Sequence, residues 1–203
     1  MSSITAQDVQ KLREQTGVGI MDAKRALTEA NGDFEQATEL LRRQGALKAA
    51  KKADRQAGEG KVFSYIHGNA QLGVLLVLNS ETDFVARSDK FAELGNDICL
   101  HIAAMNPTYL DRDSIPAELI EKETEIAREQ AAGKPAEIVE KIVEGKIEKF
   151  AGEITLLGQP FVKDDSKTVL ELINEATLVL GENIKIGHFA RFEVSGNSTI
   201  CGL

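Results

Sequence analysis

The chain has 203 residues, of which 42% are hydrophobic, and a formal net charge of −8. This length and composition suffice for one domain with a buried core and a small satellite, and they exclude a disordered chain. The acidic excess argues against direct nucleic-acid binding, because that affinity comes largely from Lys and Arg neutralising phosphates. No apolar run approaches the roughly 20 residues of a membrane span, and the amino terminus lacks a signal-peptide pattern, so we expect a soluble cytoplasmic protein.

Residues 1–45 predict a compact module of three short helices. Thr5 and Asp8 match a capping box at the start of the first helix, and Gly17 follows its end. Asp33 is placed to cap the third helix, which we expect to end at Gly45. The pattern is similar to that of ubiquitin-associated domains, in which the first loop and the second helix form a docking surface.

Residues 46–60 predict a basic linker that is helical at first and then flexible up to Gly60. Lys and Arg alternate with Ala there, and no aromatic residue interleaves that could stack on a base. A solvated connector is therefore favoured over a nucleic-acid-binding arm.

Residues 61–203 predict an α+β core in which a small three-stranded antiparallel sheet packs with helices and a helical hairpin at about 115–150. The expected elements are strands at 61–67, 72–79 and 186–194, a helix through 91–105, two hairpin helices at 116–131 and 135–150, and a last helix at 167–180. Apolar residues are expected to form the hairpin seam: Leu119, Ile126, Ile138, Ile142, Val143 and Ile147. Asp164 and Asp165 are expected in a solvated loop.

The sequence offers little for catalysis or for metal binding. Cys99 and His101 are two residues apart on a predicted helix, so they should point to different faces and form no dyad. His67 and His188 lack the further group that a catalytic set requires. The sequence has neither Cys-x-x-Cys nor His-Glu-x-x-His, and the Gly-Glu-Gly-Lys segment ending at Lys61 lacks the rest of a phosphate loop. We expect no enzyme activity, no metal and no cofactor.

The two cysteines are too few for a secreted disulfide scaffold. Cys99 lies in an apolar helical pattern and is expected to be a buried thiol. Cys201 lies two residues from the end of the chain and is expected to be accessible, so that it could link two copies under oxidising conditions.

Residues 78–87 read Leu-Asn-Ser-Glu-Thr-Asp-Phe-Val-Ala-Arg and stand where an apolar strand passes into a polar helix start. An Asp-Phe step at this position has two interpretations. Asp83 could cap the next helix while Phe84 packs into the core, or the pair could meet a partner.

This segment resembles a signature of the elongation factor Ts family, the nucleotide-exchange factors of the translational GTPase elongation factor Tu. A second segment agrees with it: Leu12-Arg13 and the run Thr-Gly-Val-Gly-Ile-Met-Asp-Ala-Lys-Arg-Ala-Leu at residues 16–27 follow the amino-terminal signature of that family. One position departs, because members usually carry Glu where this chain has Val77.

The resemblance implies a set of partner-binding residues. Thr82, Asp83, Phe84 and Val85 would contact the GTPase beside its Mg²⁺ site, with Phe84 inserting into an apolar pocket. Arg13, Ile20 and Met21 would bind its nucleotide domain, although Ile20 and Met21 could instead pack inward. His67 resembles a segment that touches another domain of the partner.

The resemblance also implies a homodimer, because this chain has one sheet module where longer family members have two. A small sheet with two apolar faces needs cover on both. The competing class is an adaptor that binds ubiquitin-like or nascent chains through the three-helix module, and an enzyme is a distant third.

Overall fold

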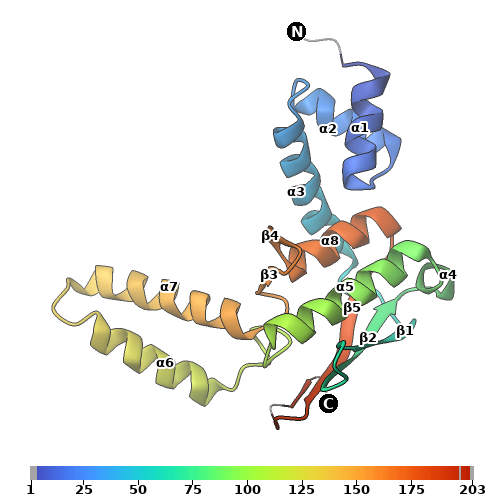
Figure 1. Ribbon diagram of the computed structural model, residues 1–203. Helices are drawn as coiled ribbons and strands as arrows, with labels where there is room; N and C mark the ends of the chain where they lie inside the picture. Colours follow the sequence, from blue (N-terminus) through green and yellow to red (C-terminus); the bar gives the residue numbers. More distant parts are fainter. Residues whose placement is uncertain (1–3, 197, 202–203) are drawn as a thin grey trace. The chain divides into compact units, whose positions relative to one another are not determined.

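The structure, a computed structural model, describes residues 4–196 and 198–201 (Figure 1). The outermost residues of the predicted domains, 1–3 and 202–203, lie outside this range. The chain groups into two compact units. Unit 1 takes the residues up to Val62 together with Val77–Gly95 and Glu171–Ile186; unit 2 takes Phe63–Leu76, Asn96–Leu170 and the residues from Gly187 on.

Unit 1 begins with three helices, α1 (Ala6–Thr16), α2 (Ile20–Glu29) and α3 (Phe34–Lys52). The predicted capping box at α1 is confirmed. The backbone N–H of Asp8 donates to the Thr5 hydroxyl at 3.2 Å, and the Asp8 carboxylate accepts from the Thr5 N–H at 2.9 Å. The three helices share a buried apolar core: Val9, Leu12, Val18, Ala23, Ala26, Leu27, Ala30, Ala37 and Leu41.

The third helix does not end at Gly45 as predicted but continues to Lys52, so the first part of the linker is helical as expected and belongs to α3. Gly45 is buried against α8 (Val169–Leu180), the helix predicted at 167–180. A Cβ at this position would lie 3.3 Å from the carbonyl oxygen of Asn174, so the glycine allows two helices to approach closely. The flexible linker also ends earlier than expected, since residues 59 and 60 already belong to a strand.

The main sheet has four strands in the order β1-β2-β5-β6. The strands are β1 (Glu59–Ile66), β2 (Leu72–Ser80), β5 (Lys185–Glu193) and β6 (Thr199–Cys201). The three predicted strands are present, but the prediction of only three is wrong because β6 adds to β5 in antiparallel register.

The pairing of β6 with β5 explains why Cys201 is buried and not accessible, contrary to the prediction. Cys201 stands opposite Phe189 in the register, and its thiol donates to the carbonyl oxygen of Thr108 at 3.0 Å. Cys99, on α5 (Asp89–Met105), is buried as predicted.

The helical hairpin of unit 2 consists of α6 (Ala117–Gln130) and α7 (Ala136–Ile154), which run side by side in Figure 1. Its seam is only partly the predicted one. Val143 and Ile147 are buried there against Ala127, whereas Ile126 and Ile138 are exposed. The small Ala127 side chain, which was not expected in the seam, occupies the contact instead.

A second, two-stranded sheet pairs β3 (Pro160–Phe161) with β4 (Asp164–Thr168), so Asp164 and Asp165 lie in a strand and not in the expected loop, although Asp165 is exposed. Close to this sheet, the buried His101 joins three segments of unit 2. Its Nε2 lies 3.0 Å from Oε1 of Gln159, and its Nδ1 accepts the backbone N–H of Val162 at 3.2 Å. Among the helices of the described part of the chain, none has the length and apolar character to cross a membrane.

Candidate partner-binding site

The residues Thr82–Val85, which we call the tip, follow β2 after one intervening residue, Glu81, and open the short helix α4 (Asp83–Ala86). Thr82 is the N-cap residue, and its hydroxyl accepts the backbone N–H of Val85 at 3.4 Å. Phe84 is 82% exposed. The alternative in which Asp83 caps the helix while Phe84 packs into the core is therefore wrong on both counts.

Asp83 forms an ion pair with Arg87, one helical turn further on, at 2.8 Å. The Arg87 side chain is 74% exposed and that of Asp83 43%, and solvent-exposed pairs of this kind contribute only about 0–1 kcal/mol. A partner could therefore redirect the Asp83 carboxylate with little loss. Ala86, by contrast, is buried, so this side of the turn packs against the rest of the chain.

The base of the tip is held by a residue from the loop after α8. One carboxylate oxygen of Glu182 accepts the backbone N–H of Thr82 at 3.0 Å, and the other accepts the Thr82 hydroxyl at 2.6 Å. Sequence reasoning missed Glu182, which follows a helix with no motif around it and lies 100 residues from Thr82. We find no sequence signal that could have identified it.

The residues expected to dock a partner through the amino-terminal module are all at the surface. Ile20 and Met21, at the start of α2, are 55% and 72% exposed, and Arg13 on α1 is exposed too. Inward packing of Ile20 or Met21 is thereby ruled out. These residues belong to unit 1, as do the residues of the tip.

Unit 1 connects the module to the segment after the tip through direct contacts. Nζ of Lys90, on α5, donates to the carbonyl oxygen of Gly17 at 3.0 Å in the loop between α1 and α2. Leu178 and Val179 of α8 pack against the core of the three helices. The module is thus part of the same compact body that carries Phe84.

His67 lies in unit 2, at the exposed turn between β1 and β2. Its Nδ1 is 3.0 Å from the hydroxyl of Tyr65. The structure therefore assigns it to a different unit from the other predicted site residues.

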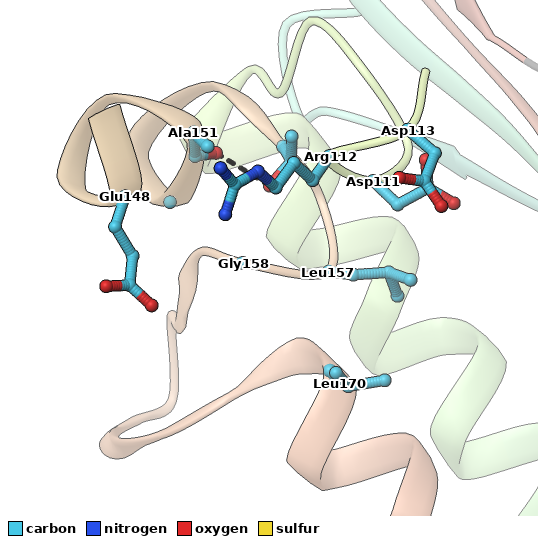
Figure 2. A pocket seen from close by; sticks show the side chains of 10 residues that line it. Asp111, Arg112, Asp113, Glu148, Ala151, Leu157, Gly158 and Leu170 are labelled. Atoms are coloured by element: carbon cyan, nitrogen blue, oxygen red, sulfur yellow. Dashed lines mark hydrogen bonds between the residues drawn. The ribbon is translucent and has the colours of Figure 1, made fainter. Parts of the chain in front are cut away.

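Unit 2 also has a hollow of about 440 Å³ between the loop before α6, the end of α7 and the start of α8 (Figure 2). Leu157 and Leu170 line it together with the charged side chains of Arg112, Asp113 and Glu148. The residues predicted to bind a partner do not line this hollow.

The described residues include no group of three or more His, Cys, Asp or Glu side chains placed to hold a metal ion. Burial raises the pKa of Cys99 to about 12 and lowers the pKa of His101. A thiol with so high a pKa is a poor nucleophile, because the thiolate is the reactive form.

An exposed aromatic residue on a fixed turn and exposed apolar residues at a helix start are typical of a protein that binds another protein. Comparisons with known proteins identify the family. The family model described as "Elongation factor TS" matches residues 21–197. An elongation factor Ts of Fervidobacterium nodosum is 54% identical over 193 residues, covering 94% of this chain and 98% of the relative.

Two further relatives carry the same name. That of Acetivibrio thermocellus is 56% identical over 192 residues, covering 94% of this chain and 89% of the relative. That of Thermosipho melanesiensis is 52% identical over 193 residues, covering 94% and 98%. The chain belongs to the elongation factor Ts family, which places it among the factors of translation elongation.

Proposed function

We propose that the chain is a guanine nucleotide exchange factor for elongation factor Tu, acting in the cytoplasm during the elongation stage of protein synthesis. Membership of the family supports this proposal, and the exposure of Phe84 carries it. An 82% exposed phenylalanine has most of its apolar area available for burial in a partner.

The proposed mechanism weakens the hold of the partner on GDP. A GTPase holds GDP through backbone N–H groups of its phosphate loop, a lysine and a Mg²⁺ ion with near-octahedral ligation. Phe84 inserts into an apolar pocket of the GTPase beside the metal site, while Asp83 hydrogen-bonds to or repels groups nearby. The Mg²⁺ shell is disturbed and GDP leaves. No bond is made or broken on this chain, so it acts as a binding factor and not as an enzyme, with no cofactor of its own.

The amino-terminal module gives the complex a second contact. Arg13, Ile20 and Met21 bind the nucleotide domain of elongation factor Tu, and Met21 suits an adaptable surface because its side chain is flexible and polarisable. His67 contributes a weaker contact with another domain. Coupling between the two ligands is reciprocal, so GDP must weaken the binding of this chain as much as the chain weakens GDP binding.

The decisive experiment is stopped-flow release of a fluorescent GDP from elongation factor Tu. Truncating an aromatic anchor typically removes about 2 kcal/mol or more, so Phe84→Ala should slow stimulated release by at least about tenfold. Ile138→Ala is the matched control, since it removes an exposed apolar side chain from the hairpin. Asp83→Ala tests the acidic group separately. A release rate unchanged by Phe84→Ala would exclude insertion of this residue.

The exposed Ile20 and Met21 also suit the alternative, an adaptor that binds ubiquitin-like or nascent chains. Affinity capture with elongation factor Tu, with and without GDP, separates the two functions. An exchange factor must bind the nucleotide-free GTPase more tightly, because the coupling is reciprocal. Binding to other partners with no response to GDP would favour the adaptor.

We further propose that a second copy of the chain covers one face of the main sheet. Within unit 2, this face leaves four apolar side chains exposed: Ile66, Leu75, Phe192 and Ile200. Their strand neighbours Val74, Leu76 and Cys201 are buried, as alternation along a strand requires. Leu75→Asp should convert a dimer to a monomer in sedimentation equilibrium, and a wild-type chain that is monomeric at high concentration would contradict the proposal.

A further inference from the structure

The tip is too short to keep its conformation unaided. Helix α4 spans four residues, and a single turn fixes several dihedral angles for very few hydrogen bonds. Phe84 adds no packing to its own chain because its side chain is exposed. The contacts that hold Phe84 in the exposed position must therefore be made by other residues of the turn, such as its N-cap.

Glu182 accepts hydrogen bonds from both donors of Thr82, its backbone N–H and its hydroxyl. The Thr82 hydroxyl donates to the carboxylate at 2.6 Å, and this leaves an oxygen lone pair free to accept the Val85 N–H at 3.4 Å. The same carboxylate accepts the Thr82 backbone N–H at 3.0 Å. Glu182 thus fixes the direction of the N-cap hydroxyl that starts α4, and hydrogen bonds to a charged acceptor are about twice as strong as neutral ones.

Glu81 forms the reciprocal contact. Its carboxylate accepts the backbone N–H of Asn183 at 2.7 Å and lies 3.5 Å from the guanidinium of Arg55. Each of two neighbouring segments therefore gives a carboxylate to a backbone N–H of the other. We call residues Gly181–Asn183 the bridge loop.

The bridge loop is tied in turn to the end of α3. The ammonium of Lys52 donates to the carbonyl oxygen of Gly181. The side-chain amide of Asn183 donates to the carbonyl oxygen of Arg55 at 2.9 Å. A continuous set of polar contacts therefore runs from the last turn of α3, through the bridge loop, to the N-cap of α4.

We propose that Glu182 is a positioning residue, supported by Glu81, that holds the tip in the conformation in which Phe84 meets the partner. The inference deepens the exchange function proposed above and rests on it for any effect on GDP release. The hold itself is a property of the free chain and can be tested without a partner.

The first experiment is hydrogen exchange of the free chain, followed residue by residue by NMR. Glu182→Ala should lower the protection of the Thr82 and Val85 amides by about tenfold or more, because local opening governs exchange. Glu182→Gln keeps one acceptor oxygen and should lie between this variant and the wild type, and it replaces the alanine variant if that fails to fold. Glu93→Ala, which removes an exposed carboxylate from α5, is the control. Unchanged protection of both amides in Glu182→Ala would overturn the proposal.

The second experiment is a double-mutant cycle on GDP release from elongation factor Tu. If Glu182 acts through Phe84, Glu182→Ala should slow release by about tenfold in the wild type but by less than about twofold when Phe84→Ala is already present. Equal slowing in both backgrounds would mean that Glu182 acts independently of Phe84, and the proposal would be wrong. A wild-type chain that stimulates no GDP release would contradict the exchange function. The hydrogen-exchange experiment would still show whether Glu182 holds the tip in place.

Discussion

Lowering the pH from about 7.5 to about 5.5 should destabilise the fold through His101. The amide nitrogen of Gln159 donates to the carbonyl oxygen of Glu153 at 2.8 Å, so Oε1 of Gln159 faces His101 and accepts its Nε2–H. Nδ1 of His101 already accepts the Val162 N–H. Burial disfavours the charged ring, and a second proton, on Nδ1, would point at the Val162 N–H; the hydrogen bond to Gln159 opposes these effects but is the smaller influence on the pKa. Both effects favour the neutral ring, and the pKa of His101 is lowered from its usual 6.5.

Proton linkage gives the direction and the size of this loss of stability. The unfolded chain takes up a proton on this histidine as the pH falls through about 6.5, whereas the folded chain takes it up only at a lower pH because its pKa is lowered. The contribution of His101 to the free energy of unfolding is therefore fully present above pH 6.5 and decreases as the pH falls below it. One pH unit below the unfolded pKa, the loss is at most about 1.4 kcal/mol in the free energy of unfolding.

Urea denaturation at three pH values between about 5.5 and 7.5 measures this loss, with His101→Asn as the comparison. The variant should be less stable throughout but should lack the part of the pH dependence that belongs to His101. This window lies above the range in which the carboxylates with lowered pKa, such as Asp8 and Glu193, take up protons. Identical pH dependence in the wild type and the variant would refute the reasoning.

Two further predictions concern the backbone near the tip and a buried thiol. Gly60 has a φ of 149°, and a Cβ there would lie 2.2 Å from the carbonyl oxygen of Leu78, so Gly60→Ala should lower the free energy of unfolding by about 2 kcal/mol or more. Gly68→Ala, where a Cβ would meet nothing within 4 Å, is the control in the same urea titration, and equal stability of the two variants would contradict the steric argument. Cys99, with its pKa raised to about 12, should react with a thiol reagent at about pH 8 only after unfolding, as followed by mass spectrometry. Rapid modification of the folded chain would disprove this.

Local signals in the sequence predicted local structure well. The capping box of Thr5 and Asp8 and the N-cap at Asp33 are present as expected, because the groups that satisfy a helix start lie within three residues of it. The exposure of Phe84 was one of two interpretations that the sequence left open, and the structure decides between them because the side chain is 82% exposed.

The errors arose where a distant segment decides the outcome. In the sequence Gly45 resembles a glycine that ends a helix, but in the structure it allows α3 to approach the backbone of Asn174. Strand β6 has three residues and exists only because β5 pairs with it, and that pairing also buries Cys201. Glu182 is an ordinary acidic loop residue until the fold brings it to Thr82.

The distance along the chain between Thr82 and Glu182 also has a consequence during synthesis. At about 5–20 residues per second, a ribosome needs roughly 5–20 s to add the 100 residues that separate them. During that interval the nascent chain carries Thr82 without the carboxylate that accepts its backbone N–H and its hydroxyl in the folded chain. The two Thr82–Glu182 hydrogen bonds can therefore form only after at least 100 further residues have been added.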